Sequence, residues 1–330
     1  MHMADALLSP AVGGAMLVVS SGVLAYSIRD IRRDFQESRI PLMGVAGAFV
    51  FAAQMVNFAI PGTGSSGHIG GAVLLAALLG PSPAFLVMAG VLLIQALFFA
   101  DGGLLAWGCN LFNLGFFGCY LAYPYLFRPL AGREMSRPRL LVASLAACIV
   151  SMEAGALAVT LETLLSGVTE LPFRTFSSVM LPIHLAIGIG EGIATGAVLF
   201  FIRAHLPEVD SLRLEEKSFS LTRFTLVFGL TALLIGGGLS LLASGKPDGL
   251  EWAVAKTSGS AEPGLSSSVH TFLAALADKI ALLPDYGFSG GDTTLGSVVA
   301  GVAGVVICAV LLGAGGYLIC RRKSHHGVPR

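Results

Sequence analysis

Long uncharged apolar stretches recur along this chain at the length of a membrane-crossing helix. Residues 11–28, 81–100 and 298–320 carry almost no ionisable side chain. About 20 apolar residues in an α-helix cross a hydrocarbon core of ~30 Å. Because a soluble core could bury one such helix but not eight or nine, the pattern predicts an all-α polytopic membrane protein in a lipid bilayer.

Nine apolar segments divide the chain into two predicted units. Residues 1–205 form a seven-helix bundle, 206–221 a charged cytoplasmic linker, and 222–330 two further transmembrane helices around a long outer loop, 244–296. The loop is rich in Gly, Ser, Pro and Asp, so we expect it to be mostly irregular, with a short amphipathic helix over 270–283. The third segment is too short to cross a bilayer alone and is expected to belong to a broken or re-entrant element. The nine predicted segments are residues 11–28, 42–60, 69–80, 83–100, 104–123, 140–165, 179–202, 222–243 and 297–320.

Basic residues are distributed unevenly between the two sides that these segments define. With the N-terminus outside, sixteen Lys and Arg fall on the inner side and four on the outer side. Since cytoplasmic loops carry an excess of Lys and Arg, we expect an extracytoplasmic N-terminus and a cytoplasmic C-terminus in the cell (inner) membrane. The first arginines follow the first apolar stretch, so that stretch is predicted to remain as a span rather than to act as a signal peptide. The outer set is Arg174, Lys246, Lys256 and Lys279.

The composition narrows the classes of function. Hydrophobic residues make up 55% of the chain and charged residues 12%, against about 25% charged in soluble domains. The net charge of zero gives no reason to expect nucleic-acid binding. Five cysteines are scattered without a C-x-x-C pair, so a thiolate metal site is not predicted.

The first two residues carry a candidate metal-binding pattern. A free α-amine at Met1, the amide nitrogen of His2 and the imidazole of His2 can close two small chelate rings around one ion. Planar nitrogen ligands suit Ni²⁺ or Cu²⁺, which are acidic enough to help the amide lose its proton. Three nitrogens leave one equatorial position for a fourth ligand. The alternative interpretation is that His2 is the second residue of a frayed terminus.

A Gly/Ser-rich turn over residues 57–71 holds a single histidine, His68, on the same predicted side as His2. Glycines let a backbone approach a ligand closely, and irregular backbone at membrane depth has to be buried or line a cavity. His68 is therefore a candidate for the fourth nitrogen, with Ser66 of the same turn as a supporting residue. Alternatively, His68 is a polar loop residue that caps a helix.

Polar side chains also lie inside the apolar segments, where they cost free energy and usually face a bundle interior. Gln54 and Asn57 stand one helical turn apart, as do Asn110 and Asn113, so each pair could hydrogen-bond on one face and hold the His68 loop. The alternative is that these residues only link helices to one another.

His184 and Glu191 lie seven residues apart, on one face of a predicted helix. They could form a proton or ion relay, or simply make polar packing contacts. With Asp101 they are also the candidate acids and bases of an intramembrane enzyme, but no nucleophile lies beside a base and no H-E-x-x-H motif occurs. A Walker-type motif is absent as well, so ATP hydrolysis has to come from other chains, and we predict a transporter subunit rather than an enzyme.

Several motifs occur in the order found in a known family. The start Met1-His2, with Leu8-Ser9-Pro10, resembles that of the substrate-capture (M) components of cobalt and nickel energy-coupling-factor transporters. Residues 243–252, which contain Pro-Asp-Gly-Leu-Glu, resemble the signature of the small two-span N component, so the chain resembles an M–N fusion. The M resemblance covers roughly residues 1–205 and also rests on the stretches 62–68, 98–103, 110–113 and 184–192.

The resemblance implies a seven-span capture protein whose N-terminus folds into the bundle. Met1, His2 and His68 would hold Ni²⁺ or Co²⁺, the transported substrate, in a square-planar set of nitrogens, with no bound organic cofactor. The implied partners are a transmembrane coupling (T or Q) subunit and two cytoplasmic ATPase (A or O) subunits, and the implied roles are cobalt uptake for cobalamin synthesis or nickel uptake for nickel enzymes. Family members often carry Ile-Pro-Asp-Gly or Ile-Met-Glu-Gly after Met-His. Here Ala6 replaces that glycine, which leaves the ligands intact and the choice of metal open.

Two other functions fit the same architecture. One is a membrane capture subunit for an organic micronutrient, which needs an apolar pocket with aromatic anchors rather than a plane of nitrogens. The other is a purely structural assembly subunit, in which the 247–252 loop holds partners together. Metal binding that depends on His2 and His68 would separate metal capture from both.

Overall fold

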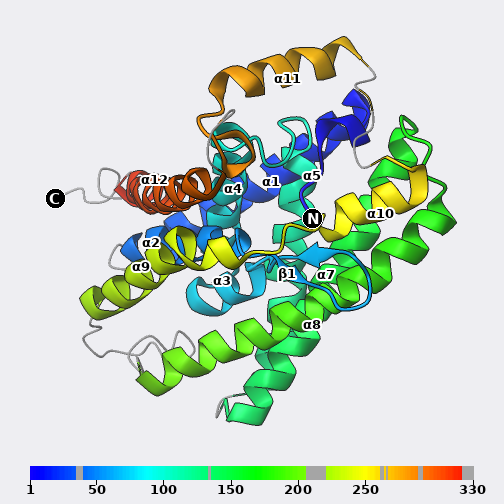
Figure 1. Cartoon of the computed structure of the whole chain (residues 1–330). Helices are drawn as coiled ribbons and strands as arrows, with labels where there is room; N and C mark the ends of the chain where they lie inside the picture. The colour runs from blue at the N-terminus through cyan, green and yellow to red at the C-terminus, as the bar shows by residue number, and fades with distance from the viewer. Residues whose placement is uncertain are drawn as a thin grey trace.

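Helices make up most of the computed structural model of this chain (Figure 1). The structure describes residues 1–34, 40–132, 135–205, 221–260, 264, 267–288 and 293–321. The strands in these ranges are two residues long each and pair antiparallel, so the all-α prediction is confirmed. The elements are η1 (Asp5–Leu7), α1 (Pro10–Asp34), α2 (Ile40–Gln54), β1 (Phe58–Ala59), β2 (Ser66–Gly67), α3 (Ala72–Leu79), α4 (Pro81–Phe98), α5 (Trp107–Leu111), the π-helix η3 (Phe112–Phe127), α6 (Arg128–Ala131), α7 (Arg137–Ser166), α8 (Phe173–His205), α9 (Leu221–Gly237), η5 (Leu239–Leu242), α10 (Gly249–Ser258), α11 (Ser268–Ile280), η6 (Pro284–Tyr286) and α12 (Thr293–Arg321).

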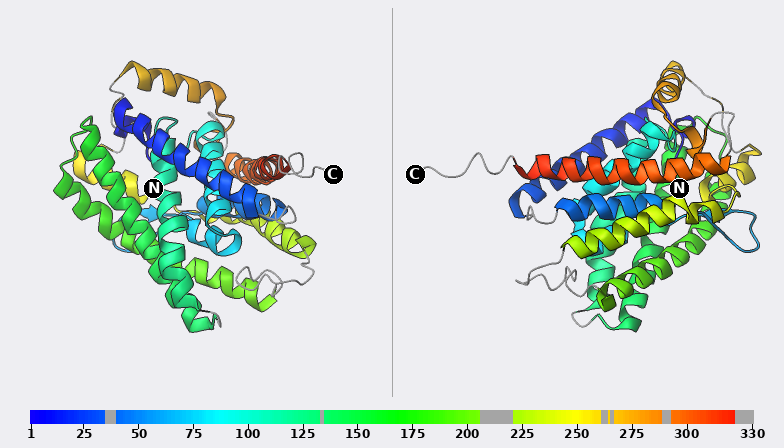
Figure 2. Two further views of the ribbon diagram at one scale, coloured as in Figure 1. Left: turned by 180° about the vertical axis from the view of Figure 1, so that it is seen from behind. Right: turned by 60° about the vertical axis from the view of Figure 1, so that its left-hand side comes forward.

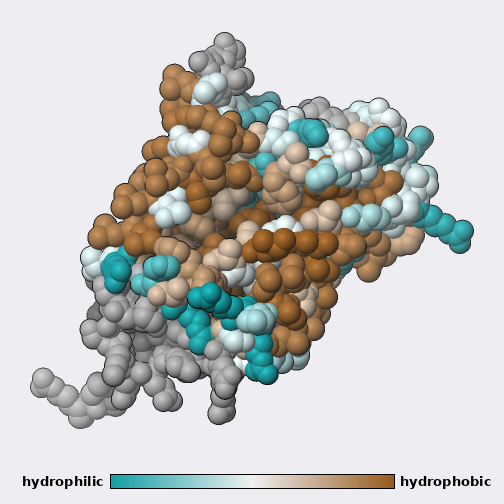
Figure 3. All heavy atoms as spheres, turned by 60° about the horizontal axis from the view of Figure 1, so that its bottom comes forward, coloured by the Kyte–Doolittle hydropathy of each residue, from teal (hydrophilic) through white to brown (hydrophobic). Residues whose placement is uncertain are grey.

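Five helices in the described part of the chain are long and apolar enough to cross a membrane: α1, α4, α7, α8 and α12. The helices α2 and α9 are apolar but shorter, and α5, η3 and α6 follow one another without a break. Large apolar side chains stay exposed along these helices, for example Val18 and Leu165 at 74% each. Figure 3 shows a broad hydrophobic flank with hydrophilic residues toward its ends. Because soluble monomers rarely expose such patches, the multi-pass membrane prediction is confirmed.

The third apolar segment forms a short helix that ends in a sharp turn. All eight residues of α3 are buried, and Gly80 then takes φ 87° before α4 begins at Pro81. Glycine adopts this backbone conformation without steric cost, and proline suits the first position of a helix. The predicted broken element is therefore present, enclosed by α4 and η3.

Two helices of the C-terminal part, α9 and α12, pack against α2 (Figures 1 and 2). A Cβ atom at Gly44 would lie 2.6 Å from the carbonyl oxygen of Ala309, and one at Gly304 would lie 2.1 Å from the ring of Phe51. Small residues at such crossings let helices approach closely in a membrane. The linker predicted over 206–221 lies outside the described residues except for its last position, where α9 begins.

The outer loop is more helical than predicted. The expectation of a mostly irregular segment is wrong for α10, which starts with a capping box. The Asp248 side chain accepts hydrogen bonds from the Leu250 and Glu251 amides, and the Glu251 side chain accepts one from the Asp248 amide. This pairing satisfies amides at the helix start that have no partner within the helix. The predicted amphipathic helix is confirmed as α11.

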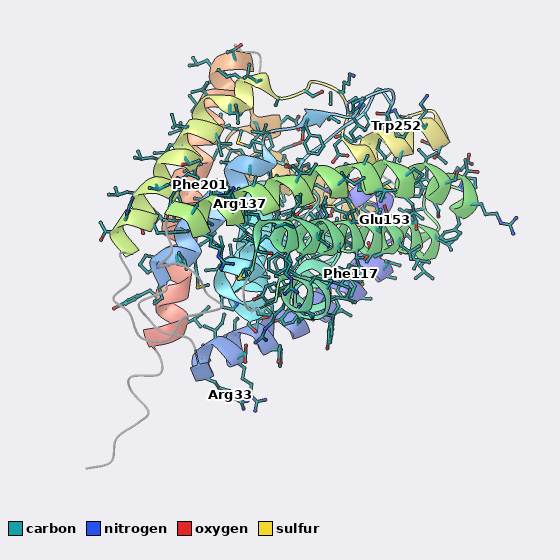
Figure 4. The ribbon with its side chains drawn as sticks, turned by 90° about the horizontal axis from the view of Figure 1, so that it is seen from below. Arg33, Phe117, Arg137, Glu153, Phe201 and Trp252 are labelled. Atoms are coloured by element: carbon teal, nitrogen blue, oxygen red, sulfur yellow. The ribbon has the colours of Figure 1, made fainter. Side chains whose placement is uncertain are left out.

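The arginine-bearing helix ends lie away from the outer loop. The last turn of α1 holds Arg32 and Arg33, and the last turn of α8 holds Arg203. In the right-hand view of Figure 2, the ends of α8 and α12 lie on one side of the molecule, while α10 and α11 lie on the other. Figure 4 likewise separates Arg33 from Trp252 of α10. The N-terminal residues lie on the α10 side.

Candidate metal centre

The N-terminal segment is folded into the protein. Met1 is 4% exposed, and Met3 and Leu8 are fully buried. Both backbone groups of Met3 bind one side chain, since its amide donates to Asn110 Oδ1 at 2.7 Å and its carbonyl accepts from Asn110 Nδ2 at 3.1 Å. Asn110 thus holds the segment as a neighbouring β-strand would, with one donor and one acceptor.

A glycine pair forms the other wall of this groove. Gly102 has φ 87°, and the Gly103 amide donates to the Met3 carbonyl at 2.9 Å. A Cβ atom at Gly103 would lie only 2.5 Å from the Asp5 amide nitrogen. The short helix η1 follows, and the Asp5 carboxylate accepts from the Ala106 amide at 2.9 Å. Ala6 is buried in η1.

The amine of Met1 meets His68, 67 positions away. The amine nitrogen lies 3.0 Å from His68 Nε2. His68 Nδ1 lies 3.0 Å from the carbonyl oxygen of Ile69. A carbonyl can only accept, so Nδ1 carries the ring proton and the Nε2 lone pair faces the amine. The His2 ring stacks on His68 with centroids 5.0 Å apart, so the three predicted ligand residues are in contact.

A carboxylate from the outer loop completes this cluster. Asp248 Oδ2 accepts a hydrogen bond from the Met1 amine at 2.7 Å and lies 3.8 Å from His68 Nε2. On the other side of the site, His2 Nδ1 lies 3.3 Å from Asp101 Oδ1. Among the described residues, no three His, Cys, Asp or Glu side chains form a conventional metal cluster. Any metal bound here would need main-chain nitrogens as well.

The loop that carries His68 is hydrogen-bonded to buried side chains of two helices, Gln54 of α2 and Glu191 of α8. Gln54 Nε2 donates to the Gly70 carbonyl at 2.8 Å, and Gln95 Nε2 donates to Gln54 Oε1 at 2.9 Å. From α8, Glu191 Oε1 accepts from the Gly71 amide at 2.8 Å. These bonds fix the backbone just after His68 and therefore the direction of its ring.

The outer loop is hydrogen-bonded to the loop that carries His68. The Ser66 amide donates to the Pro247 carbonyl at 2.8 Å, and the Ser66 hydroxyl donates to the Lys246 carbonyl at 2.7 Å. The Tyr286 hydroxyl donates to Asp101 Oδ2, so it reaches His2 through one carboxylate.

His270 of α11 adds a contact lower in the N-terminal segment, since its Nε2 donates to the Leu8 carbonyl at 2.9 Å. Together with Asp248 and Tyr286, this bond means that three separate parts of the outer loop reach the first eight residues or their immediate neighbours. The loop therefore encloses the N-terminal segment.

The predicted supporting residues contact two different parts of the site, the His68 loop and the N-terminal segment. Gln54 holds the His68 loop, whereas Asn110 and Asn113 lie against Met3 instead. Asn113 also donates to Glu162 Oε2 at 2.7 Å. Asn110 and Asn113 therefore hold the N-terminal segment rather than the His68 loop. The Asn57 side-chain oxygen has no hydrogen-bond partner among the described residues, although the Asn57 carbonyl accepts from the Ser244 amide.

His184 and Glu191 also have separate partners. His184 Nδ1 lies 2.8 Å from the Met180 carbonyl, while Glu191 binds the Gly71 amide. His184 Nε2 is buried without a hydrogen-bond partner in the described residues, and a Cβ atom at Gly249 would lie 3.3 Å from it. His184 therefore lies beneath the start of α10.

Burial controls the protonation of the histidines. It lowers the pKa of His68 to about 3, with further lowering by the Met1 amine and His2. Burial also lowers the pKa of His2, although Asp101 opposes it. For Asp248, burial raises the pKa, but the positive charge of the Met1 amine and its hydrogen bond to the carboxylate outweigh burial and hold this pKa below its usual range. Both imidazoles are therefore neutral at pH 7, the form in which a histidine binds a metal.

Two residues of the cluster were missed by sequence reasoning. Asp248 belongs to a recognised signature, but nothing near it in the sequence indicates a contact with Met1, 247 positions away. Tyr286 lies in a loop without any motif. The one available signal was local: the spacing of Asp248 and Glu251 is that of a capping box, which predicts a helix start and nothing more.

Comparison with known proteins agrees with this architecture. The family model described as the cobalt uptake substrate-specific transmembrane region (CbiM) matches residues 2–209, and the PDGLE domain model matches residues 222–321. The putative fused nickel transport protein NikMN of Archaeoglobus fulgidus is 30% identical over 94% of this chain and 96% of its own length. The fused nickel transport protein NikMN of Rhodobacter capsulatus is 31% identical over 98% of this chain and 100% of its own length.

A solved structure supports the same assignment. A crystal structure of a truncated transition metal transporter superposes with a TM-score of 0.55 at 30% identity, and covers 62% of this chain and 99% of that one. The relatives are named as transport proteins, and the fold is that of a multi-pass membrane protein. This chain therefore belongs to the CbiM family of cobalt and nickel transport proteins, with a PDGLE domain in the same polypeptide.

Proposed function

We propose that this chain captures Ni²⁺ or Co²⁺ on the extracytoplasmic side of the cell membrane, as the substrate-binding subunit of an energy-coupling-factor importer. The ion is held by four nitrogens: the Met1 amine, the His2 amide, the His2 imidazole and His68 Nε2. Nitrogen ligands in a plane suit the late first-row divalent ions.

One observation carries the proposal, namely the 3.0 Å separation between the Met1 amine and His68 Nε2. Neighbouring nitrogens in a square plane with metal–nitrogen bonds of ~2.0 Å lie ~2.8 Å apart. The two groups therefore stand at nearly the spacing of two adjacent ligands. The neutral state of His68 and the direction of its Nε2 lone pair also favour ligation.

Chelation sets two conditions on the N-terminus. The amine has to be free and to lose a proton, since an ammonium group has no lone pair to give. The His2 ring has to turn so that Nδ1, which faces Asp101, comes round to the amide and amine.

The two matched regions support a proposal in which each part of the chain has its own role. Residues 1–205 act as the capture unit, 206–221 as the cytoplasmic linker, and 222–330 as a two-span unit whose outer loop, 244–296, covers the site. The N-terminus is extracytoplasmic and the C-terminus cytoplasmic, which agrees with arginine in the last turns of α1 and α8. Transport requires a transmembrane coupling subunit and two cytoplasmic ATPase subunits. The imported metal is cobalt for cobalamin synthesis or nickel for nickel enzymes.

The test is the metal content of protein purified with a native, untagged N-terminus, compared with the His2→Ala and His68→Ala variants. We expect about one nickel or cobalt ion per chain in the unaltered protein and a loss of at least tenfold in affinity in each variant. A chain lengthened by one residue before Met1 should insert in the membrane but lose the ion. Unaltered protein without bound metal, or metal that persists in all three variants, would return the function to organic-substrate capture or a structural role.

A further inference from the structure

The carboxylate of Asp248 reaches the candidate metal centre from the second unit of the chain. We propose that Asp248 is itself a metal ligand, a carboxylate oxygen that the PDGLE unit adds to the four nitrogens of the capture unit. This inference rests on the proposed function. The site is then shared between the two units, and its ligand set is incomplete without the outer loop.

The distances fit a fifth ligand that stands off the nitrogen plane. An oxygen ~2.2 Å above a metal with ~2.0 Å bonds to its in-plane nitrogens lies ~3.0 Å from each of them. Asp248 Oδ2 lies 2.7 Å from the Met1 amine nitrogen and 3.8 Å from His68 Nε2. These two values bracket the expected separation, so a small movement of the side chain brings the oxygen into bonding range.

The position of Asp248 is fixed by its role in the fold. Its Oδ1 atom accepts hydrogen bonds from the Leu250 amide at 2.6 Å and the Glu251 amide at 3.1 Å. The preceding carbonyl, at Pro247, is held by the Ser66 amide next to the His68 loop. One carboxylate oxygen therefore starts α10, and the other, Oδ2, is left to point at the site.

The start of α10 is shaped for this close approach. A Cβ atom at Gly249 would lie 2.8 Å from Ile187 Cδ1 and 3.1 Å from His184 Cε1. A side chain there would lift the start of α10, and Asp248 with it, away from α8. Glycine directly after Asp248 therefore allows the carboxylate to reach a site buried between the two units.

The Asp248 carboxylate would neutralise the positive charge that remains on the bound ion. A divalent ion bound to one deprotonated amide and three neutral nitrogens still carries one net positive charge. Burying an uncompensated charge costs several kcal/mol, and a paired charge costs far less. The Asp248 carboxylate supplies the second negative charge, and its side chain is only 15% exposed. Carboxylate oxygen is also an accepted ligand for these ions.

The decisive measurement is the coordination number of bound Ni²⁺ in the full chain with a native N-terminus. Nickel in a plane of four nitrogens is diamagnetic, whereas five-coordinate nickel is paramagnetic, so magnetic susceptibility and the visible absorption spectrum distinguish them. We expect paramagnetic nickel in the unaltered protein. Asp248→Asn, which keeps a good helix cap, should give diamagnetic nickel and bind it about tenfold or more weakly.

Glu251→Gln is the matched control, because this side chain belongs to the same capping box. It should leave the nickel spectrum unchanged. Diamagnetic nickel in the unaltered protein would overturn the ligand role of Asp248, and this measurement does not depend on the folding of any variant. A nickel spectrum of Asp248→Asn identical to that of the unaltered protein would overturn it as well. By contrast, nickel binding that is unchanged in His2→Ala and His68→Ala would mean that the proposed function itself has failed.

Discussion

Gly103 lies where no side chain fits. Its amide binds the Met3 carbonyl, and a Cβ atom would lie 2.4 Å from Asp5 Cγ and 2.5 Å from the Asp5 amide nitrogen. The second contact is with backbone and cannot be relieved by a change of rotamer. The N-terminal segment can therefore follow this path only past a glycine, which gives a physical reason for the Gly-Gly pair in the motif over residues 98–103.

Gly103→Ala should consequently displace the first residues and remove metal binding. We expect the overpacking to cost about 1–3 kcal/mol of docking free energy for the segment, while the bundle still inserts. Gly14→Ala is the control, because nothing lies within 4 Å of a Cβ atom at Gly14 in α1. Metal content of both purified variants is the measurement. Unchanged metal in Gly103→Ala would mean that the Met1 amine reaches His68 by another path.

At the scale of elements, helix α8 contributes to the site through one buried carboxylate. Glu191 accepts the amide of Gly71, and Gly71 itself has φ 84° at the start of α3. The turn between His68 and α3 is thus bonded to a helix far away in sequence. Without this acceptor, a buried amide would lose its partner, which costs about 1–3 kcal/mol.

Glu191→Leu tests this link, because leucine removes the acceptor at similar volume. We expect the His68 loop to shift and metal affinity to fall about 10–100-fold, the usual scale for groups that orient a ligand. The matched control is Glu153→Leu on α7, whose Oε1 atom has no hydrogen-bond partner among the described residues. Titration of both variants with Ni²⁺ or Co²⁺ measures the difference. Equal affinities would remove Glu191 from any part in positioning His68.

The sequence predicted some of these helices and contacts and missed others. Apolar length alone predicted the long helices and the short α3, because lipid allows few alternatives to a helix, but it did not predict their ends: α8 begins at Phe173 rather than 179, and α9 ends at Gly237 rather than 243. It did not predict that the fifth segment continues as the π-helix η3 from Phe112. The helix α10 was missed because Gly and Pro were weighed above the Asp248–Glu251 cap. His2 and His68 could be chosen from chemistry, but the contact of Asp248 with Met1 is purely tertiary.

At the scale of the whole molecule, the two units are joined at two levels. Within the membrane, α12 packs on α2, and Gly304 lies against the fully buried ring of Phe51. Outside it, Asp248, Tyr286 and His270 reach the N-terminal segment and its neighbours. We expect the helix packing to supply most of the binding between the two proposed domains, since α2 packs along both α9 and α12 and this contact is larger than that of α10 with α8.

Gly304→Leu separates these two contributions. A protease site placed within residues 206–221 lets the two units be cut apart after purification, and the unaltered fragments should remain together in detergent. Phe51 cannot move aside easily, because it also packs against Phe99 and Tyr286, so a leucine at 304 should push α12 off α2 and release the C-terminal fragment. Gly315→Leu in the same helix, where nothing lies within 4 Å, should not. Fragments that stay joined in Gly304→Leu would mean that the outer loop, through its hold on the metal-binding segment, is the stronger bond between the units.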